Sequence, residues 1–170
     1  MKKSLVALLL SSANIVLAQS SNPLVASSKA IYGIVSGNVV KAAEEMPEEN
    51  YSFKPTPEVR SFGQLIGHVA DAQYAFCGAA SGEKANPPNA EKTKTSKADL
   101  VQALKDAVAY CDKAYSGLTD AEAVQTVKFF GRELPKLSVL SFNTAHTDEH
   151  YGNIVTYLRL KGLVPPSSQR

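Results

Sequence analysis

The sequence predicts an all-α protein, an antiparallel four-helix bundle with a short extended segment before the last helix. Three observations support this fold class. Apolar residues recur at steps of three and four in four long stretches of the chain. Two of these stretches open with a capping-box sequence. Prolines, glycines and polar residues separate the stretches, which gives each helix a defined end.

The first helix is expected from about residue 23 to residue 46, because Pro47 cannot continue it. Its spacing predicts an apolar face made of Leu24, Ile31, Ile34, Val35, Val39 and Ala42. Residues 47–60 contain three prolines and are expected to form a loop, from which Tyr51 and Phe53 can pack against the helices.

The other three helices are expected at residues 61–80, 96–115 and 135–161. Capping boxes that begin at Ser61 and Ser96 open the second and third helices. A polar linker with two consecutive prolines separates these two helices. Pro135 suits the first turn of the fourth helix, which ends at Gly162. Just before it, residues 127–134 have the composition of a short extended or hairpin segment.

The N-terminus predicts export from the cytoplasm. Residues 1–18 have the form of a signal peptide, with two lysines, an apolar stretch and a small-residue cleavage sequence. Residues 19–170 are then a single domain. We expect the mature protein in the periplasm or outside the cell, with no membrane attachment after signal cleavage.

The two cysteines, Cys77 and Cys111, both fall on predicted helices. An oxidising compartment allows a disulfide between them to persist. Two buried thiols that pack as small apolar residues are an equally good interpretation, since sequence cannot place the two Cα atoms within bridging distance. The sequence leaves the bridge open.

The charge balance argues against nucleic acid as a partner. The chain has 18 basic and 16 acidic residues, and two of the basic residues belong to the predicted signal peptide. The mature chain is therefore close to neutral. It has no stripe of basic residues with interleaved aromatics, so we expect no nucleic-acid binding.

All three histidines of the chain have positions suited to one metal ion. His146 and His150 are four residues apart on the apolar face of the last predicted helix, so their rings point the same way. His68 lies on the apolar face of the second helix. Three converging imidazoles leave coordination positions open, which is typical of catalytic rather than structural metal sites. The alternative is a polar core without metal, which would leave buried imidazoles poorly hydrogen-bonded.

Residues 146–150 also fit the H-x-x-E-H motif of inverzincin peptidases. That family has a further glutamate ligand well downstream of the motif. No acidic residue follows Glu149 in this chain, so we reject the peptidase interpretation.

Four stretches together resemble the DinB/YfiT-like metalloenzyme family, namely residues 46–57, 61–71, 146–153 and 157–166. The resemblance implies a four-helix bundle in which His68, His146 and His150 bind a divalent metal, and it implies a possible homodimer. Characterised members include transferases that use low-molecular-weight thiols. Many relatives have arginine and Gly-Gln after the last histidine, where this chain has Tyr151-Gly152-Asn153.

We therefore expect a metal-dependent enzyme, a hydrolase or a transferase, that acts on a small molecule. Imidazole ligands suit several divalent metals, of which zinc is our first choice and nickel our second. Glu149, beside His150, and Asp71, three residues after His68, are the candidate catalytic proton carriers. Either could instead be a solvated position or orient a ligand imidazole. The alternative function is a non-catalytic metal-binding or interaction module built on the same bundle.

Overall fold

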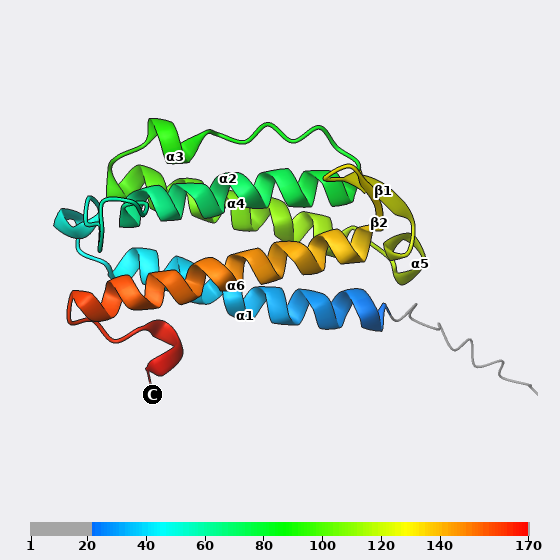
Figure 1. Cartoon of the computed structure of the whole chain (residues 1–170). Helices are drawn as coiled ribbons and strands as arrows, with labels where there is room; N and C mark the ends of the chain where they lie inside the picture. The colour runs from blue at the N-terminus through cyan, green and yellow to red at the C-terminus, as the bar shows by residue number, and fades with distance from the viewer. Residues whose placement is uncertain (1–21, 170) are drawn as a thin grey trace, which may run out of the picture.

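The computed structural model describes residues 22–169 and shows an antiparallel bundle of four long helices (Figure 1). These helices are α1 (Pro23–Glu45), α2 (Phe62–Ser81), α4 (Lys97–Ser116) and α6 (Lys136–Leu160). The short elements are η1 (Glu48–Asn50), α3 (Ala90–Thr93), α5 (Asp120–Ala123), β1 (Thr126–Phe129), β2 (Arg132–Pro135) and η2 (Pro166–Ser168). The predicted fold class is confirmed. The predicted signal peptide, residues 1–18, lies outside the described residues.

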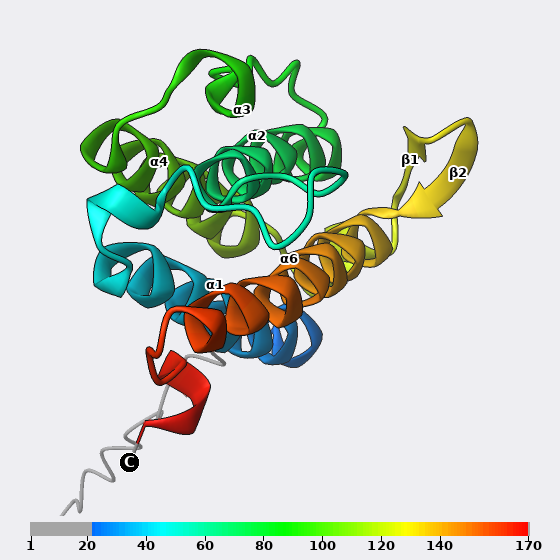
Figure 2. The same cartoon turned by 60° about the vertical axis from the view of Figure 1, so that its left-hand side comes forward.

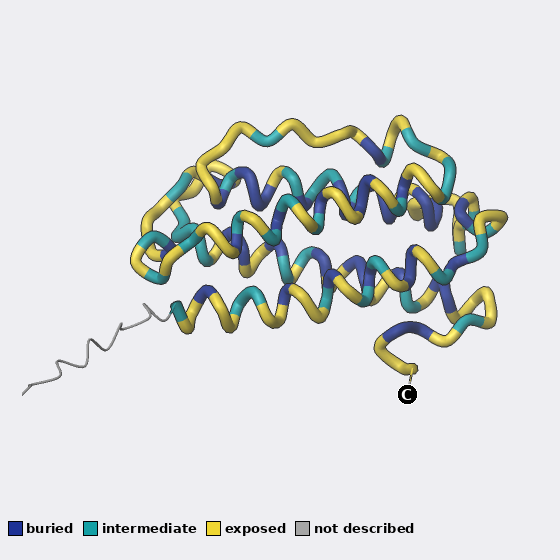
Figure 3. Tube along the Cα trace, turned by 180° about the vertical axis from the view of Figure 1, so that it is seen from behind, coloured by how far each residue is buried: buried dark blue, intermediate teal, exposed yellow. Residues whose placement is uncertain are grey.

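The helices form two layers, with α2 and α4 in one and α1 and α6 in the other (Figure 1, Figure 2). Buried residues line the inner faces of all four helices, and the outer faces are exposed (Figure 3). α2 contacts both α4 and α6 extensively, so it is the central helix of the bundle. Within residues 22–169, no helix has the length and apolar character needed to cross a membrane.

Local sequence explains where α2 begins and ends. The Ser61 hydroxyl accepts a hydrogen bond from the Gln64 backbone N–H, and the Gln64 side chain accepts one from the Ser61 N–H. These two bonds satisfy amides that the first turn of a helix leaves free. Gly82 ends the helix with φ 73°, a conformation that glycine adopts without steric strain. Both boundaries agree with the sequence prediction.

The predicted apolar face of α1 was partly wrong. Val39 and Ala42 are buried, but Leu24, Ile31 and Ile34 are more than half exposed. The buried face instead contains Tyr32, whose ring stacks on Tyr115 and whose hydroxyl donates to the Gln73 side chain at 2.6 Å. An amphipathic tyrosine therefore sets the rotation of the helix, and a count of purely apolar residues does not detect it.

A disulfide joins Cys77 of α2 to Cys111 of α4, with the two Cα atoms 5.3 Å apart. Both cysteines are fully buried. This bond answers the question that the sequence left open, and it fixes α2 covalently against α4.

The segment before α6 is the predicted hairpin, in which β1 pairs antiparallel with β2 and projects from one end of the bundle (Figure 2). Phe130 and Gly131 form its two-residue turn and have φ values of 47° and 75°. Turns that require positive φ at both positions match the twist of paired strands. Phe129 is buried against Phe76 of α2, and this contact holds the hairpin to the bundle.

Candidate metal centre

Helices α2 and α6 bring the three histidines together. Each of His68, His146 and His150 offers a ligand nitrogen, and these nitrogens all lie within 4.8 Å of one another. The His68 ring lies 5.2 Å from the His146 ring and 4.8 Å from the His150 ring, between centroids. Side chains from two helices far apart in the sequence therefore converge on one point, as their places on the apolar faces of the predicted helices indicate.

His146 and His150 converge because one turn of α6 separates them. Their Nε2 atoms are 3.1 Å apart. Burial, and after it the neighbouring His146 and His68, lower the pKa of His150 to about 4. Burial, then His68, also lowers the pKa of His146. Both rings are therefore neutral near pH 7, the form in which an imidazole nitrogen can bind a metal.

His68 has a partner that the sequence did not reveal. Its Nδ1 lies 2.9 Å from the Oε2 of Glu91, and the other oxygen of Glu91 accepts a hydrogen bond of 2.8 Å from Arg60 Nε. Partial burial raises the pKa of Glu91, but the hydrogen bonds from Arg60 and His68 outweigh it and leave the pKa below its ordinary value. The carboxylate is therefore ionised. Glu91 falls in the polar linker that the sequence predicted, 23 residues after His68. No helical or strand periodicity relates two positions so far apart, so the sequence alone could not pair them.

The two predicted proton carriers lie in different surroundings. Asp71 uses both carboxylate oxygens to accept backbone N–H groups, from Ala90 at 2.8 Å and from Glu91 at 3.0 Å. These contacts direct its carboxylate to α3, and its role as a proton carrier stays a prediction. Glu149 is exposed on α6, close enough to His146 for its charge to favour the protonated ring. Of the two, only Glu149 has a carboxylate that is free to act in the way the sequence suggested.

An open cleft of about 680 Å³ lies beside His150. His150 and Glu91 form part of its wall, which continues with Pro55, Glu58, Val59, Arg60, Leu65, Asn153, Thr156 and Tyr157. Its size falls within the range of small-molecule sites, and its wall mixes apolar and polar side chains as such sites do.

Comparison with known proteins identifies the family. Residues 35–154 match the sequence profile of the DinB superfamily. The chain belongs to the DinB superfamily. This result agrees with the resemblance seen in the histidine-containing stretches.

Two solved DinB-like structures share the fold of this DinB superfamily chain. A DinB-like protein from Bacillus cereus ATCC 10987 has a TM-score of 0.72 and 19% identity, over 83% of this chain and 95% of its own. The DinB-like protein YjoA from Bacillus subtilis has a TM-score of 0.69 and 22% identity, over 85% of this chain and 99% of its own. In sequence, the uncharacterized YjoA of Bacillus subtilis (strain 168) is 25% identical over 123 residues, 71% of this chain and 79% of YjoA.

A structural neighbour with a described activity is the mycothiol-dependent maleylpyruvate isomerase. It has a TM-score of 0.60 and 18% identity, and the alignment covers 77% of this chain and 59% of the isomerase. At this identity the likeness shows that the two proteins share a fold.

The donor set of this DinB superfamily chain fits a metal ion. The Nε2 atoms of His146 and His150 are 3.1 Å apart, so in one pair of tautomers one ring donates to the other, and in the other pair both lone pairs are available to a shared cation. His68 presents its remaining nitrogen to the same point, because its Nδ1 is engaged by Glu91. These three nitrogens would together hold a divalent cation, and three protein ligands would leave coordination positions open.

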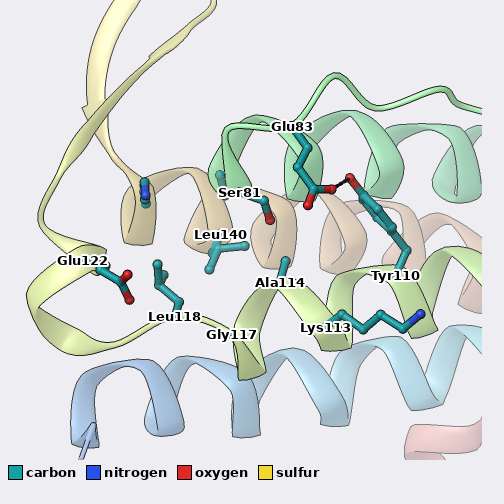
Figure 4. Close-up of a pocket in the computed structure, with 11 residues that line it drawn as sticks. Ser81, Glu83, Tyr110, Lys113, Ala114, Gly117, Leu118, Glu122 and Leu140 are labelled. Carbon is teal, nitrogen blue, oxygen red and sulfur yellow. Dashed lines mark hydrogen bonds between the residues drawn. The ribbon is translucent and has the colours of Figure 1, made fainter.

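A second pocket lies away from the histidines (Figure 4). It has a volume of about 330 Å³ and is formed by the ends of α2 and α4 and the start of α6. Glu83 and Tyr110, joined by a hydrogen bond of 3.1 Å, line one side of it. None of the three histidines lines this pocket, so the cleft beside His150 is the candidate substrate site.

Proposed function

We propose that the protein is an exported metal-dependent enzyme, a hydrolase or transferase that acts on a small molecule. His68, His146 and His150 hold a divalent ion, zinc as the first choice and nickel as the second. The observation that carries this proposal is the cluster of three imidazole side chains, one of which, His150, lines an open cleft.

Different residues would bind the substrate and transfer the proton. When bound, a divalent ion supplies polarisation of water or of a substrate oxygen or sulfur. Leu65, Val59 and Pro55 cover the apolar part of a substrate and exclude water from it. Asn153 and Thr156 offer hydrogen bonds that orient its polar part. Glu149 lies outside the cleft wall, exposed beside His146, and we propose that it takes up and returns a proton there.

The disulfide supports the proposed export. Disulfides persist in oxidising compartments and are rare in the cytosol, and the Cys77–Cys111 bond is buried between two long helices. Together with the signal-like residues 1–18, it favours folding in the periplasm or outside the cell. The partner that we propose is a small molecule, and a homodimer stays a prediction.

Metal analysis of the purified mature protein tests the proposal. Elemental analysis should find about one equivalent of zinc or nickel per chain, retained or taken up after dialysis. His68→Ala and His146→Ala should each abolish stoichiometric binding, because two imidazoles bind an ion far more weakly than three. Asp148→Asn, an exposed acidic neighbour on α6, is the matched control and should bind like the wild type.

Two results would contradict the proposal. If both histidine variants keep the wild-type stoichiometry, the ion is bound elsewhere. If the metal binds as expected but a screen of hydrolase and transferase substrates shows no activity that a chelator abolishes, the non-catalytic metal-binding module is the better interpretation.

A further inference from the structure

We propose that Glu91 is a positioning residue for His68, and that Gly67 and Asp71 hold Glu91 in place. The carboxylate fixes the imidazole in the tautomer whose Nε2 faces His146 and His150. This inference rests on the proposed metal site and adds a support to it that the family assignment does not supply.

Gly67 is the first part of this support. A Cβ atom at this position would lie 2.6 Å from the backbone N of Glu91 and 2.8 Å from the carbonyl carbon of Ala90. Rotation of a side chain cannot relieve such a contact, because the Cβ atom would meet backbone atoms. The absence of a side chain at Gly67 therefore lets α3 lie directly against α2, one residue from His68.

Asp71 is the second part. α3 has only four residues, too few for a helix to hold itself together, so it depends on contacts outside its own turn. Asp71 supplies them by accepting the backbone N–H groups of Ala90 and Glu91, one with each carboxylate oxygen. Ala90 is also fully buried. The backbone of Glu91 is thus fixed on the same face of α2 as His68.

The side chain of Glu91 then determines which nitrogen of His68 is free. An ionised carboxylate only accepts hydrogen bonds, so the His68 Nδ1 that lies 2.9 Å away must carry the hydrogen. The lone pair of the neutral ring is then on Nε2. Carboxylate partners of this kind orient metal-binding imidazoles and make them more basic.

Arg60 connects this support to α6. Its Nε donates to the second oxygen of Glu91, and its backbone carbonyl accepts a 2.6 Å hydrogen bond from Tyr157 of α6. The Arg60 side chain is 42% exposed and that of Glu91 27%, so water screens the ion pair and its contribution to stability is small. The pair therefore acts through the geometry of His68 more than through the stability of the fold.

The test compares Glu91→Ala with Glu58→Ala in the mature protein. Glu58 is a second carboxylate of the same cleft, fully exposed, and no hydrogen bond joins it to the described histidines. Titration of zinc alone should give an affinity 10- to 100-fold weaker for Glu91→Ala and unchanged for Glu58→Ala. The melting temperature of the metal-free protein should shift little in either variant.

A second measurement observes the tautomer directly. Long-range ¹H–¹⁵N spectra of metal-free protein should show His68 with its hydrogen on Nδ1 in the wild type and in Glu58→Ala. The spectra should show a mixture of tautomers in Glu91→Ala. Asp71→Asn should change the spectrum in the same direction, because it releases α3.

Wild-type affinity together with an unchanged His68 spectrum in Glu91→Ala would overturn the inference. A wild-type protein that binds no zinc would instead contradict the proposed function. The tautomer measurement distinguishes these two failures, since it needs no metal.

Discussion

Helices α2 and α6 contribute to the candidate metal centre in different ways. α6 carries two histidines with little outside support. The Nδ1 of His146 is buried and has no hydrogen-bond partner among the described residues, and that of His150 lies 3.5 Å from the Asn153 amide. α2 carries one histidine, whose Nδ1 is engaged by Glu91, and it is further fixed by a disulfide to α4.

This difference follows from helix geometry. Two residues four positions apart face the same way on any regular α-helix, so the backbone of α6 directs both side chains to the same side. A single histidine on a second helix has no such constraint on its rotation. It reaches a defined orientation only when the rest of the fold supplies a partner, and in this protein α3 supplies one. The comparison predicts that perturbations of α2 and α6 have different consequences.

The largest expected effect comes from removing the covalent bond that fixes α2. The disulfide closes a loop with a sequence separation of 34. Replacing both cysteines, Cys77→Ala with Cys111→Ala, should lower the free energy of unfolding by about 3–4 kcal/mol, mainly because the unfolded chain gains freedom. Denaturant unfolding of the oxidised wild type and the double variant measures this change.

Two controls accompany that experiment. A reductant should destabilise the wild type and leave the double variant unchanged. Zinc affinity of the folded double variant should change little, because His68 is held by Glu91 and lies well over two turns of helix from Cys77. A large loss of affinity would show that the disulfide, and not α3, positions His68.

The next effect concerns the carboxylate beside the histidines of α6. Glu149→Gln should retain fold and metal, since the exposed side chain acts on His146 only through its charge. Turnover of a substrate found by the activity screen should fall by about a hundredfold, the usual scale for a lost general base. Asp148→Asn, next to it and also exposed, should keep wild-type turnover.

Other outcomes for Glu149→Gln are informative. Unchanged turnover would remove Glu149 from the chemistry and leave proton transfer to solvent. Loss of metal would instead show that Glu149 supports His146, whose Nδ1 lacks a described partner.

The sequence predicts the α6 half of the site better than the α2 half. Regular spacing is enough to align His146 with His150, and the Ser61 capping box is enough to begin α2. Glu91 could not be predicted, because it reaches His68 through a four-residue helix that has no periodicity of its own. The hydrogen bonds from the backbone of α3 to Asp71 could not be predicted for the same reason.

The glycine at position 67, beside His68, is a feature of the sequence that bears on this support. A small residue beside His68 indicates close packing, but sequence alone cannot say that the backbone of α3, and not another long helix, fills the space. The α1 face shows a related limit, since Tyr32 sets its rotation through a hydrogen bond to Gln73 that no apolar pattern contains.

The smallest effects come from the same substitution made once on each helix. Gly152 lies on α6, is exposed, and has no atom from outside its own stretch of helix within 4 Å of the place where a Cβ would stand. Gly152→Ala should therefore raise the free energy of unfolding by about 0.5–1 kcal/mol, the ordinary gain of alanine over glycine within a helix. Gly67→Ala has the same propensity gain, but its Cβ meets the backbone of Glu91 and Ala90.

For Gly67→Ala the clash should exceed the gain, because overpacking against backbone costs about 1–3 kcal/mol. We expect a net loss of stability of about 1 kcal/mol and weaker zinc binding, since a displaced α3 carries Glu91 away from His68. Denaturant unfolding should show that the free energy of unfolding changes in opposite directions in the two variants. The zinc affinity should change only for Gly67→Ala. If both alanines stabilise the protein equally, α3 does not rest on α2 as described, and the difference between the two helices loses its structural basis.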